Sequence, residues 1–133
     1  MFGVKITDKY KHVYKYVNYQ IIVGRNQIGN DHILDHYNFV KDRCYWFHLA
    51  NSTSQHIILY LEDDIDKNEL VSIFKQIKSE ITSKKKDDVM FCKLEDVVPA
   101  PRTGKNTKTP GLVTCNKKVF MSDGGWVNLL SHR

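Results

Sequence analysis

Cysteine is scarce in this sequence, and its spacing argues against the sites that cysteine usually builds. The three cysteines, Cys44, Cys92 and Cys115, are odd in number and form no C-x-x-C pair. A structural zinc site needs closely spaced ligands and a disulfide framework needs an even set, so we predict neither. Because each cysteine has apolar neighbours, we expect three small core residues in a reducing compartment.

The sequence also lacks long apolar runs and the short motifs of common enzymes. No stretch approaches the roughly 18 apolar residues of a membrane span, and the lysine-rich start has no apolar signal-peptide core. We therefore expect a soluble cytoplasmic protein (in the host cytoplasm if the source is viral) with no membrane partner. Neither G-x-S-x-G, H-E-x-x-H nor a phosphate-binding G-x-x-x-x-G-K-[ST] motif occurs. The sequence predicts no enzyme, no metal and no cofactor.

A mild and unevenly distributed excess of positive charge is present. Twenty Lys and Arg against fifteen Asp and Glu give a net charge of +5 over 133 residues, a length that fits one domain, 1–133. No acidic residue lies between Asp96 and Asp123, whereas five lie between residues 62 and 69. We expect an acidic corner and a basic side suited to a polyanion such as nucleic acid.

Hydrophobic periodicity predicts an α+β fold with a mainly antiparallel sheet, one long helix and one short helix. Strands are expected at residues 10–17, 19–23, 44–49, 56–61, 89–94 and 97–98, and a last hairpin at 112–115 and 118–121. Asp66 begins a capping box before a helical stripe that runs to Ile81. Asn30 or Asp31 would cap a short helix through Tyr37. The absence of βαβ regularity favours antiparallel pairing.

The first candidate site is a tight turn at Gly24-Arg25-Asn26, followed by Asn30 and Asp31. Arg25 offers five N–H donors suited to phosphate, and the amides of Asn26 and Asn30 can contact a base or a ribose. The alternative is structural, with Asn26, Asn30 and Asp31 capping the turn and the helix and Arg25 in a salt bridge. The chemistry of these residues alone favours the structural alternative.

The second candidate combines Trp46 and His48 with His56 across a predicted hairpin. An indole beside two imidazoles on one sheet face is a surface on which single-strand binders stack a base. The alternative is a core tryptophan packed on a hydrogen-bonded histidine pair. A catalytic or metal site would use His48 and His56 with Asp31, but no ligand spacing and no third ligand supports it.

The acid-free stretch supplies the third candidate, a loop with Arg102, Lys105 and Lys108 at every third position. Basic loops of this kind dock on phosphate backbones and become ordered on contact. The alternative is a plain solvated loop, which is the commoner outcome for a single charge run.

Taken in order, these segments resemble the NFACT-R domain of ribosome-quality-control proteins. That family has a strand followed by G-R-N-x-x-x-N-D, a short helix, W-F-H, and a second histidine before an aliphatic strand. The corresponding residues here are 21–26, Asn30-Asp31, Trp46-Phe47-His48 and His56-Ile57-Ile58-Leu59, with a late K-x-P-G-x-V segment at 108–113. The likeness extends over nearly the whole chain and favours the functional alternative at each candidate site.

The resemblance is nearest to stand-alone eukaryotic NFACT-R proteins of the coiled-coil-domain-containing type. Cys44 stands where the family often has Asp, and Thr53-Ser54-Gln55 replaces a Pro-Gly-Ser before the second histidine. The resemblance implies an antiparallel α+β fold and nucleic-acid binding without chemistry of its own. The implied partner is RNA, as tRNA, rRNA or the ribosome, with DNA as an alternative.

Two other function classes stay open. A nuclease or hydrolase would use His48 and His56 with Asp31, and an adaptor would bind ribosomal proteins without touching RNA. Salt-sensitive RNA binding separates the binding domain from the adaptor, and RNA turnover that is lost on changing His56 would identify the hydrolase. Neither the nucleic acid nor the oligomeric state follows from the sequence.

The basic loop leads to a measurable salt dependence. If about four cations of residues 99–121 contact phosphates, log affinity for single-stranded RNA falls with log salt with a slope of about −3. Changing both Lys105→Ala and Lys108→Ala should make that slope shallower by about one to two units, nearly equally for all RNA sequences. Fluorescence anisotropy across a salt series measures the slope. A slope equal to that of the unmodified protein would show that the loop does not contact phosphates.

Overall fold

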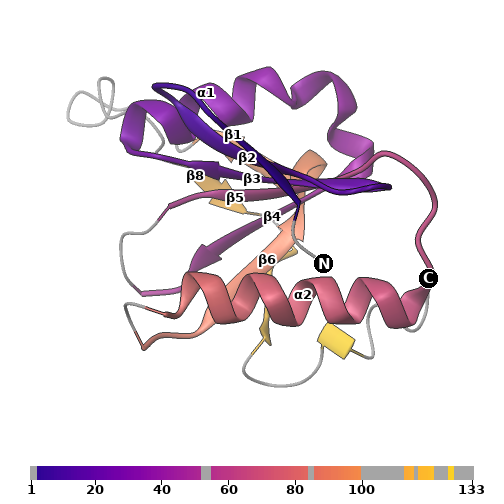
Figure 1. The fold of residues 1–133 in the computed structure, drawn as a ribbon. Coiled ribbons are helices and arrows are strands. Elements are labelled where there is room, and N and C mark those ends of the chain that lie inside the picture. The colour runs from indigo at the N-terminus through magenta and orange to yellow at the C-terminus, as the bar shows by residue number, and fades with distance from the viewer. Residues whose placement is uncertain are drawn as a thin grey trace.

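The protein has an antiparallel sheet with one α-helix on each face, as Figure 1 shows for this computed structural model. The structure describes residues 3–51, 55–83, 86–99, 113–115, 117–121 and 126–127. The strand order of the seven-stranded sheet is β1-β2-β3-β5-β4-β6-β9, and all neighbouring strands run antiparallel. The predicted α+β fold class is confirmed.

The described elements have the following bounds. The strands are β1 (Val4–Thr7), β2 (Lys11–Lys15), β3 (Tyr19–Gly24), β4 (Cys44–Leu49), β5 (Ile57–Leu61), β6 (Val89–Lys93), β7 (Val97–Pro99), β8 (Val113–Cys115) and β9 (Val119–Phe120). The helices are α1 (Gln27–His36) and α2 (Lys67–Ile81), with 3-10 segments η1 (Asn38–Arg43) and η2 (Leu94–Asp96). Among the described residues, no helix has both the length and the apolar character needed to cross a membrane.

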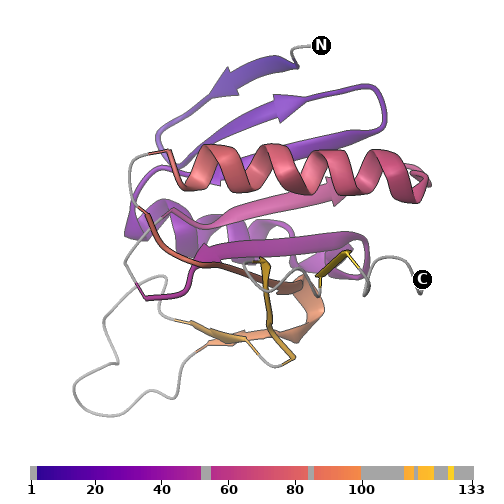
Figure 2. The ribbon, with the colours of Figure 1, turned by 90° about the horizontal axis from the view of Figure 1, so that it is seen from below.

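The long helix forms as its sequence predicts. The side chain of Asp66 accepts a hydrogen bond from the backbone N–H of Glu69 at 3.0 Å, which satisfies one of the free donors of the first turn. The apolar stripe is buried against the sheet and consists of Leu70, Ile73, Phe74, Ile77 and Ile81. Figure 2 shows α2 lying over the middle strands of the sheet.

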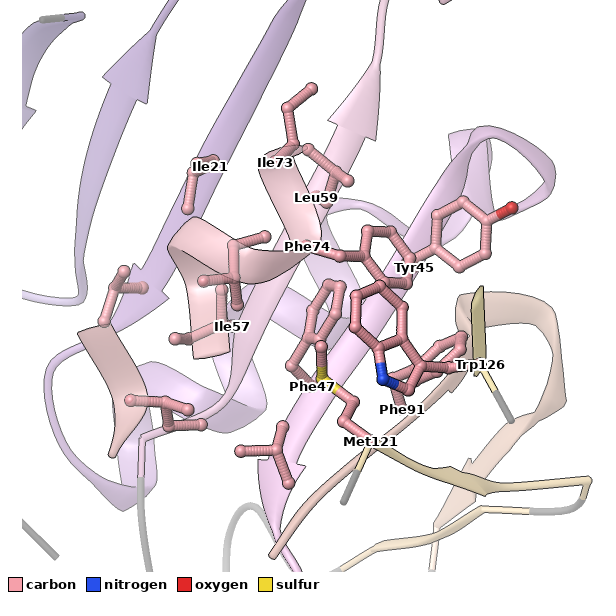
Figure 3. Packing of buried hydrophobic residues seen from close by; sticks show 14 of the residues in the cluster. Ile21, Tyr45, Phe47, Ile57, Leu59, Ile73, Phe74, Phe91, Met121 and Trp126 are labelled. Atoms are coloured by element: carbon pink, nitrogen blue, oxygen red, sulfur yellow. The ribbon is translucent and has the colours of Figure 1, made fainter. Parts of the chain in front are cut away.

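Alternation along the strands divides the buried residues into two cores. Tyr45 and Phe47 of β4 face α2, whereas Cys44 and Trp46 of the same strand face α1. On the α2 side, the ring of Phe74 packs edge-on against Tyr45 at 5.1 Å and Phe47 at 4.9 Å between centroids (Figure 3). Full burial of such a ring contributes roughly 2–3 kcal/mol, so these contacts hold α2 firmly to the sheet.

Two local predictions are wrong, and one strand was not predicted. The short helix begins at Gln27 and is capped by Asn26, so Asn30 lies within the first turns of α1 rather than before it. The predicted last hairpin does not form, because β8 pairs with β7 and β9 pairs with β6. Strand β1 was not predicted, although Val4 and Ile6 alternate with polar residues; all four of its residues are exposed, so neither apolar side chain is buried in a core.

The cysteine prediction also needs correction. A disulfide joins Cys92 of β6 to Cys115 of β8, although the two residues are 23 positions apart. Pairing of β8 with β7 causes this meeting, since it opposes Cys115 to Val97 close to the end of β6. Cys44 behaves as predicted: it is a free thiol in the α1-side core, and burial raises its pKa to about 12.

Candidate functional site

The first candidate motif forms the junction between β3 and α1. Asn26 caps α1 by accepting a hydrogen bond from the backbone N–H of Gly29 at 2.7 Å. Gly24 ends β3 and donates its backbone N–H to the carbonyl of His56 at 3.0 Å. A Cβ atom on Gly24 would lie 2.1 Å from Oδ1 of Asn30, so only glycine fits without moving that amide. The glycine of the G-R-N turn is therefore required by the packing of Asn30.

Asn30 links the helix to the sheet through a buried hydrogen bond. Its side chain is 7% exposed, and Oδ1 accepts the backbone N–H of His56 at 3.0 Å. The backbone of His56 is thus held twice, by Asn30 at its N–H and by Gly24 at its carbonyl. Loss of one partner would leave a buried polar group unsatisfied, at a cost of about 1–3 kcal/mol. The two halves of the motif are joined physically at this point.

The three rings of the second candidate lie together at the same end of the sheet. Trp46 stacks on His48 with 5.6 Å between centroids and 10° between planes. The ring of His56 meets Trp46 edge-on at 5.2 Å and His48 edge-on at 5.1 Å. Antiparallel pairing of β4 with β5 opposes Trp46 to Ile58. We call Trp46, His48 and His56 the ring cluster.

Burial decides which of these rings a ligand can reach. Trp46 is 1% exposed and His56 is 4% exposed, whereas His48 is half-buried. The expectation that Trp46 offers an open stacking surface is therefore corrected, because a covered indole cannot stack on a base in this conformation. Of the two interpretations of Trp46, packing in the core is the one that the geometry favours.

Burial also changes the protonation of the cluster. Desolvation, with a smaller contribution from His48, lowers the pKa of His56 from 6.5 to about 3, so this imidazole is neutral at pH 7. Two buried nitrogens, Nε1 of Trp46 and Nδ1 of His56, have no hydrogen-bond partner among the described residues. The indole N–H can only donate, whereas Nδ1 donates or accepts according to the tautomer. Buried atoms of this kind are normally paired.

The remaining predicted residues are placed differently. Arg25 is exposed, and its guanidinium donates to the backbone carbonyl of Asp8 at 2.8 Å rather than to a carboxylate. Asp31 is exposed on α1, next to the buried Asn30. The loop cations Arg102, Lys105 and Lys108 lie outside the described residues. Among the residues that are described, no group of three or more His, Cys, Asp or Glu side chains is arranged to hold a metal ion.

One ring arrangement was missed in the sequence. Tyr10 stacks on His32 of α1, and His32 lies above His36 one helical turn away. The spacing of the two histidines, four residues apart, would have placed them on one face of a helix. Tyr10 could not be assigned to that face, because its contact with α1 depends on how the helix packs on the sheet.

A solved structure shares this fold at low sequence identity. The chain is similar to the C-terminal part of the fibronectin/fibrinogen-binding protein from Streptococcus suis, with a TM-score of 0.57 and 18% identity. The match covers 88% of this chain and 45% of that chain, so this chain spans less than half of that structure. A likeness at this identity shows the fold alone. No protein-family model matches the chain, and no curated protein matches it significantly.

The buried neutral His56 makes stability depend on pH. The unfolded chain takes up a proton at His56 near pH 6.5 and the folded chain only near pH 3, so its contribution is complete above pH 6.5 and is lost as the pH falls toward 3. We expect the free energy of unfolding to drop by about 2 kcal/mol from pH 7 to pH 5 on account of this residue.

Urea denaturation at each pH measures this change, with His56→Gln as the control because glutamine does not titrate. The His56→Gln protein should keep only the smaller fall in the free energy of unfolding that is due to His12 and His32, because burial also lowers the pKa values of these two residues. Equal pH dependence in the two proteins would show that His56 takes up its proton without unfolding.

Proposed function

We propose that this chain is a nucleic-acid-binding domain of the NFACT-R type whose partner is RNA. The observation that carries the proposal is the meeting of the two separate motifs at one end of the sheet. The hydrogen bonds of His56 with Gly24 and Asn30 join the turn at residues 24–30 to the ring cluster. Residues that are far apart in the sequence, and that the family resemblance singles out together, therefore share one place in the fold.

The chemistry of that place suits a ligand with many hydrogen-bond acceptors. Trp46 and His56 hold buried nitrogens without a partner in the described chain, and Arg25 presents a guanidinium at the adjacent turn. Bases and phosphates carry acceptors of the kind that these groups bind. Because the indole is buried, a ligand would reach its N–H only after a displacement of the residues that cover it, so a conformational change on binding is part of the proposal.

Charge supports the same class of partner. Between residues 3 and 30 there are five cations and one acid, Asp8. The carboxylate of Asp8 is paired with Lys11 at 3.0 Å and accepts two backbone N–H groups, which lowers its pKa to about 2. Asp8 is therefore ionised at pH 7, but one carboxylate against five cations leaves this segment with a positive excess, which favours a phosphate backbone.

The proposed activity is binding without catalysis. The proposed partner is tRNA, rRNA or the ribosome in the cytoplasm, with DNA as an alternative. A general base works best with a pKa near the working pH. His56 has a pKa of about 3 and is buried, which does not suit it to accept a proton from a substrate at pH 7. We therefore expect no cleavage of RNA.

Arg25 provides the sharpest test. Arg25→Ala should weaken binding of a fluorescent single-stranded RNA by roughly five- to 150-fold, which is the loss expected for a charge-assisted contact of about 1–3 kcal/mol. Arg43→Ala is the matched control, because Arg43 is also exposed and donates to a backbone carbonyl, that of Leu61, at 2.7 Å. Arg43 precedes β4 and lies at the opposite end of the sheet from His48.

Anisotropy titrations with single-stranded RNA, tRNA and DNA measure these affinities, and gel analysis of the same samples detects cleavage. No binding of any of the three by the unmodified protein would overturn the proposal. RNA cleavage that disappears in His56→Ala would favour the hydrolase, and equal losses in the Arg25 and Arg43 variants would show that general charge, not this turn, carries the binding.

A further inference from the structure

A row of stacked rings lies on the surface formed by α1 and the turn between β1 and β2. The ring of Tyr10 stacks on His32 with 4.1 Å between centroids and 13° between planes. His32 is followed by His36 at 5.6 Å and 18°. We call Tyr10, His32 and His36 the ring row. His36 is exposed, and the other two rings are partly exposed, so the row is open to solvent along its length.

The backbone below the row is held rigidly. The carbonyl of Tyr10 accepts the backbone N–H of Arg25 at 3.0 Å, and a Cβ on Gly29 would lie 2.1 Å from the same oxygen. The carboxylate of Asp8 accepts the backbone N–H groups of Tyr10 and Lys11 at 2.7 and 2.9 Å. The turn that carries Tyr10 is therefore fixed to the first turn of α1, directly beside Arg25.

Packing of the core does not explain the ring row. Helix α1 is attached to the sheet by Ile33, which is fully buried, and the following Tyr37 is 7% exposed. Within the described residues, neither core includes Tyr10, His32 or His36. The ring of His36 meets that of Tyr37 edge-on at 5.0 Å, so the row borders the core without belonging to it. An aligned row of flat rings at a surface is a feature that base-stacking proteins use.

Two lysines flank the row. Nζ of Lys9 lies 4.9 Å from the centroid of the Tyr10 ring, and Nζ of Lys11 lies 3.5 Å from Nε2 of His32. Burial, followed by the charge of Lys11, lowers the pKa of His32, which favours the neutral form of that ring. The surface thus offers aromatic faces and ammonium groups side by side.

Three acids lie near the same surface and limit its charge. Asp8 is paired with Lys11 at 3.0 Å, and Asp31 and Asp35 are exposed on α1. Because the charge of Lys11 is partly neutralised by Asp8, Lys9 is the flanking lysine whose positive charge is less directly opposed by an acid. The excess of positive charge is small, so charge alone would hold a polyanion weakly and the ring faces must supply part of the affinity.

We infer that the ring row binds single-stranded RNA, with bases packed against the rings and the phosphate backbone beside Lys9. This inference rests on the proposed function and names a part of the binding surface that continues from the turn at Arg25. A paired duplex hides the faces of its bases, so the surface should prefer single strands. An acidic peptide would use the cations but has no base to pack against the rings.

The test compares ring and charge variants against a twelve-nucleotide oligouridine and a duplex of the same length. Tyr10→Leu keeps the backbone contacts and should weaken oligouridine binding about ten-fold with no change in salt slope. His36→Ala should act in the same direction, and His36→Phe should restore the affinity. Lys9→Gln should instead make the salt slope shallower by about 0.7 units, the value expected for one phosphate contact on a single strand.

Matched controls come from the other face of the sheet. Tyr16 is stacked on Tyr19 at 4.5 Å and 9°, so Tyr16→Leu removes a comparable stacked ring, and Lys75→Gln removes a charge from the exposed side of α2. Both controls should bind as the unmodified protein does. Thermal unfolding of each variant confirms that it is folded, and His36 variants, at an exposed position, remain informative if Tyr10→Leu does not fold.

The outcomes separate the two proposals. No binding of oligouridine or any other nucleic acid by the unmodified protein overturns both the function and the ring row. Binding that is weakened by Arg25→Ala but unchanged in all of the Tyr10, His36 and Lys9 variants overturns the ring row alone. Duplex binding as tight as oligouridine binding, or losses in Tyr16→Leu equal to those in Tyr10→Leu, also overturns it.

Discussion

The backbone of His56 is the point on which the candidate site depends. Its N–H is satisfied by the buried amide of Asn30 and its carbonyl by the N–H of Gly24, so one residue holds a helix and two strands in place. Buried polar groups tolerate few alternative arrangements, because leaving one unpaired is costly. This constraint explains why position 24 is glycine, and why α1 begins early enough for Asn30 to point inward. The edge-on contacts of His56 with Trp46 and His48 depend on it, because it holds His56 beside them.

Much of the fold could be predicted from local patterns. The helix from Asp66 and the strand from Cys44 to Leu49 are specified by caps and periodicity, which act over a few residues. What failed was non-local: the pairing of β8 with β7 and the meeting of Cys92 with Cys115 depend on how distant segments pack. The start of α1 was misplaced for a different reason, since Asn26, Asn30 and Asp31 are all competent to cap a helix.

The sequence indicated which residues make up the candidate site more easily than which of them are exposed to solvent. The motif residues at 24–30 and 46–56 do come together, as the sequence order suggested. Alternation places Trp46 on the face opposite to Tyr45, but it does not say whether that face is covered. Here α1 and η1 cover it, which leaves the indole buried. The partly exposed ring of Tyr10 and the exposed ring of His36 lie instead on the outer side of the same helix and its neighbouring turn, beside Arg25. A buried, rigid junction with an open aromatic and basic surface next to it suits recognition better than proton transfer.

The most direct test of this central constraint is amide hydrogen exchange at His56. Because its N–H is bonded to a buried acceptor, it should exchange as slowly as the amides of the central strands, and Asn30→Ala should accelerate exchange at His56 and Gly24 while Phe74 in α2 stays protected. Exchange of the His56 amide in the unmodified protein at the rate of an open loop would contradict the claim that this residue holds the site together.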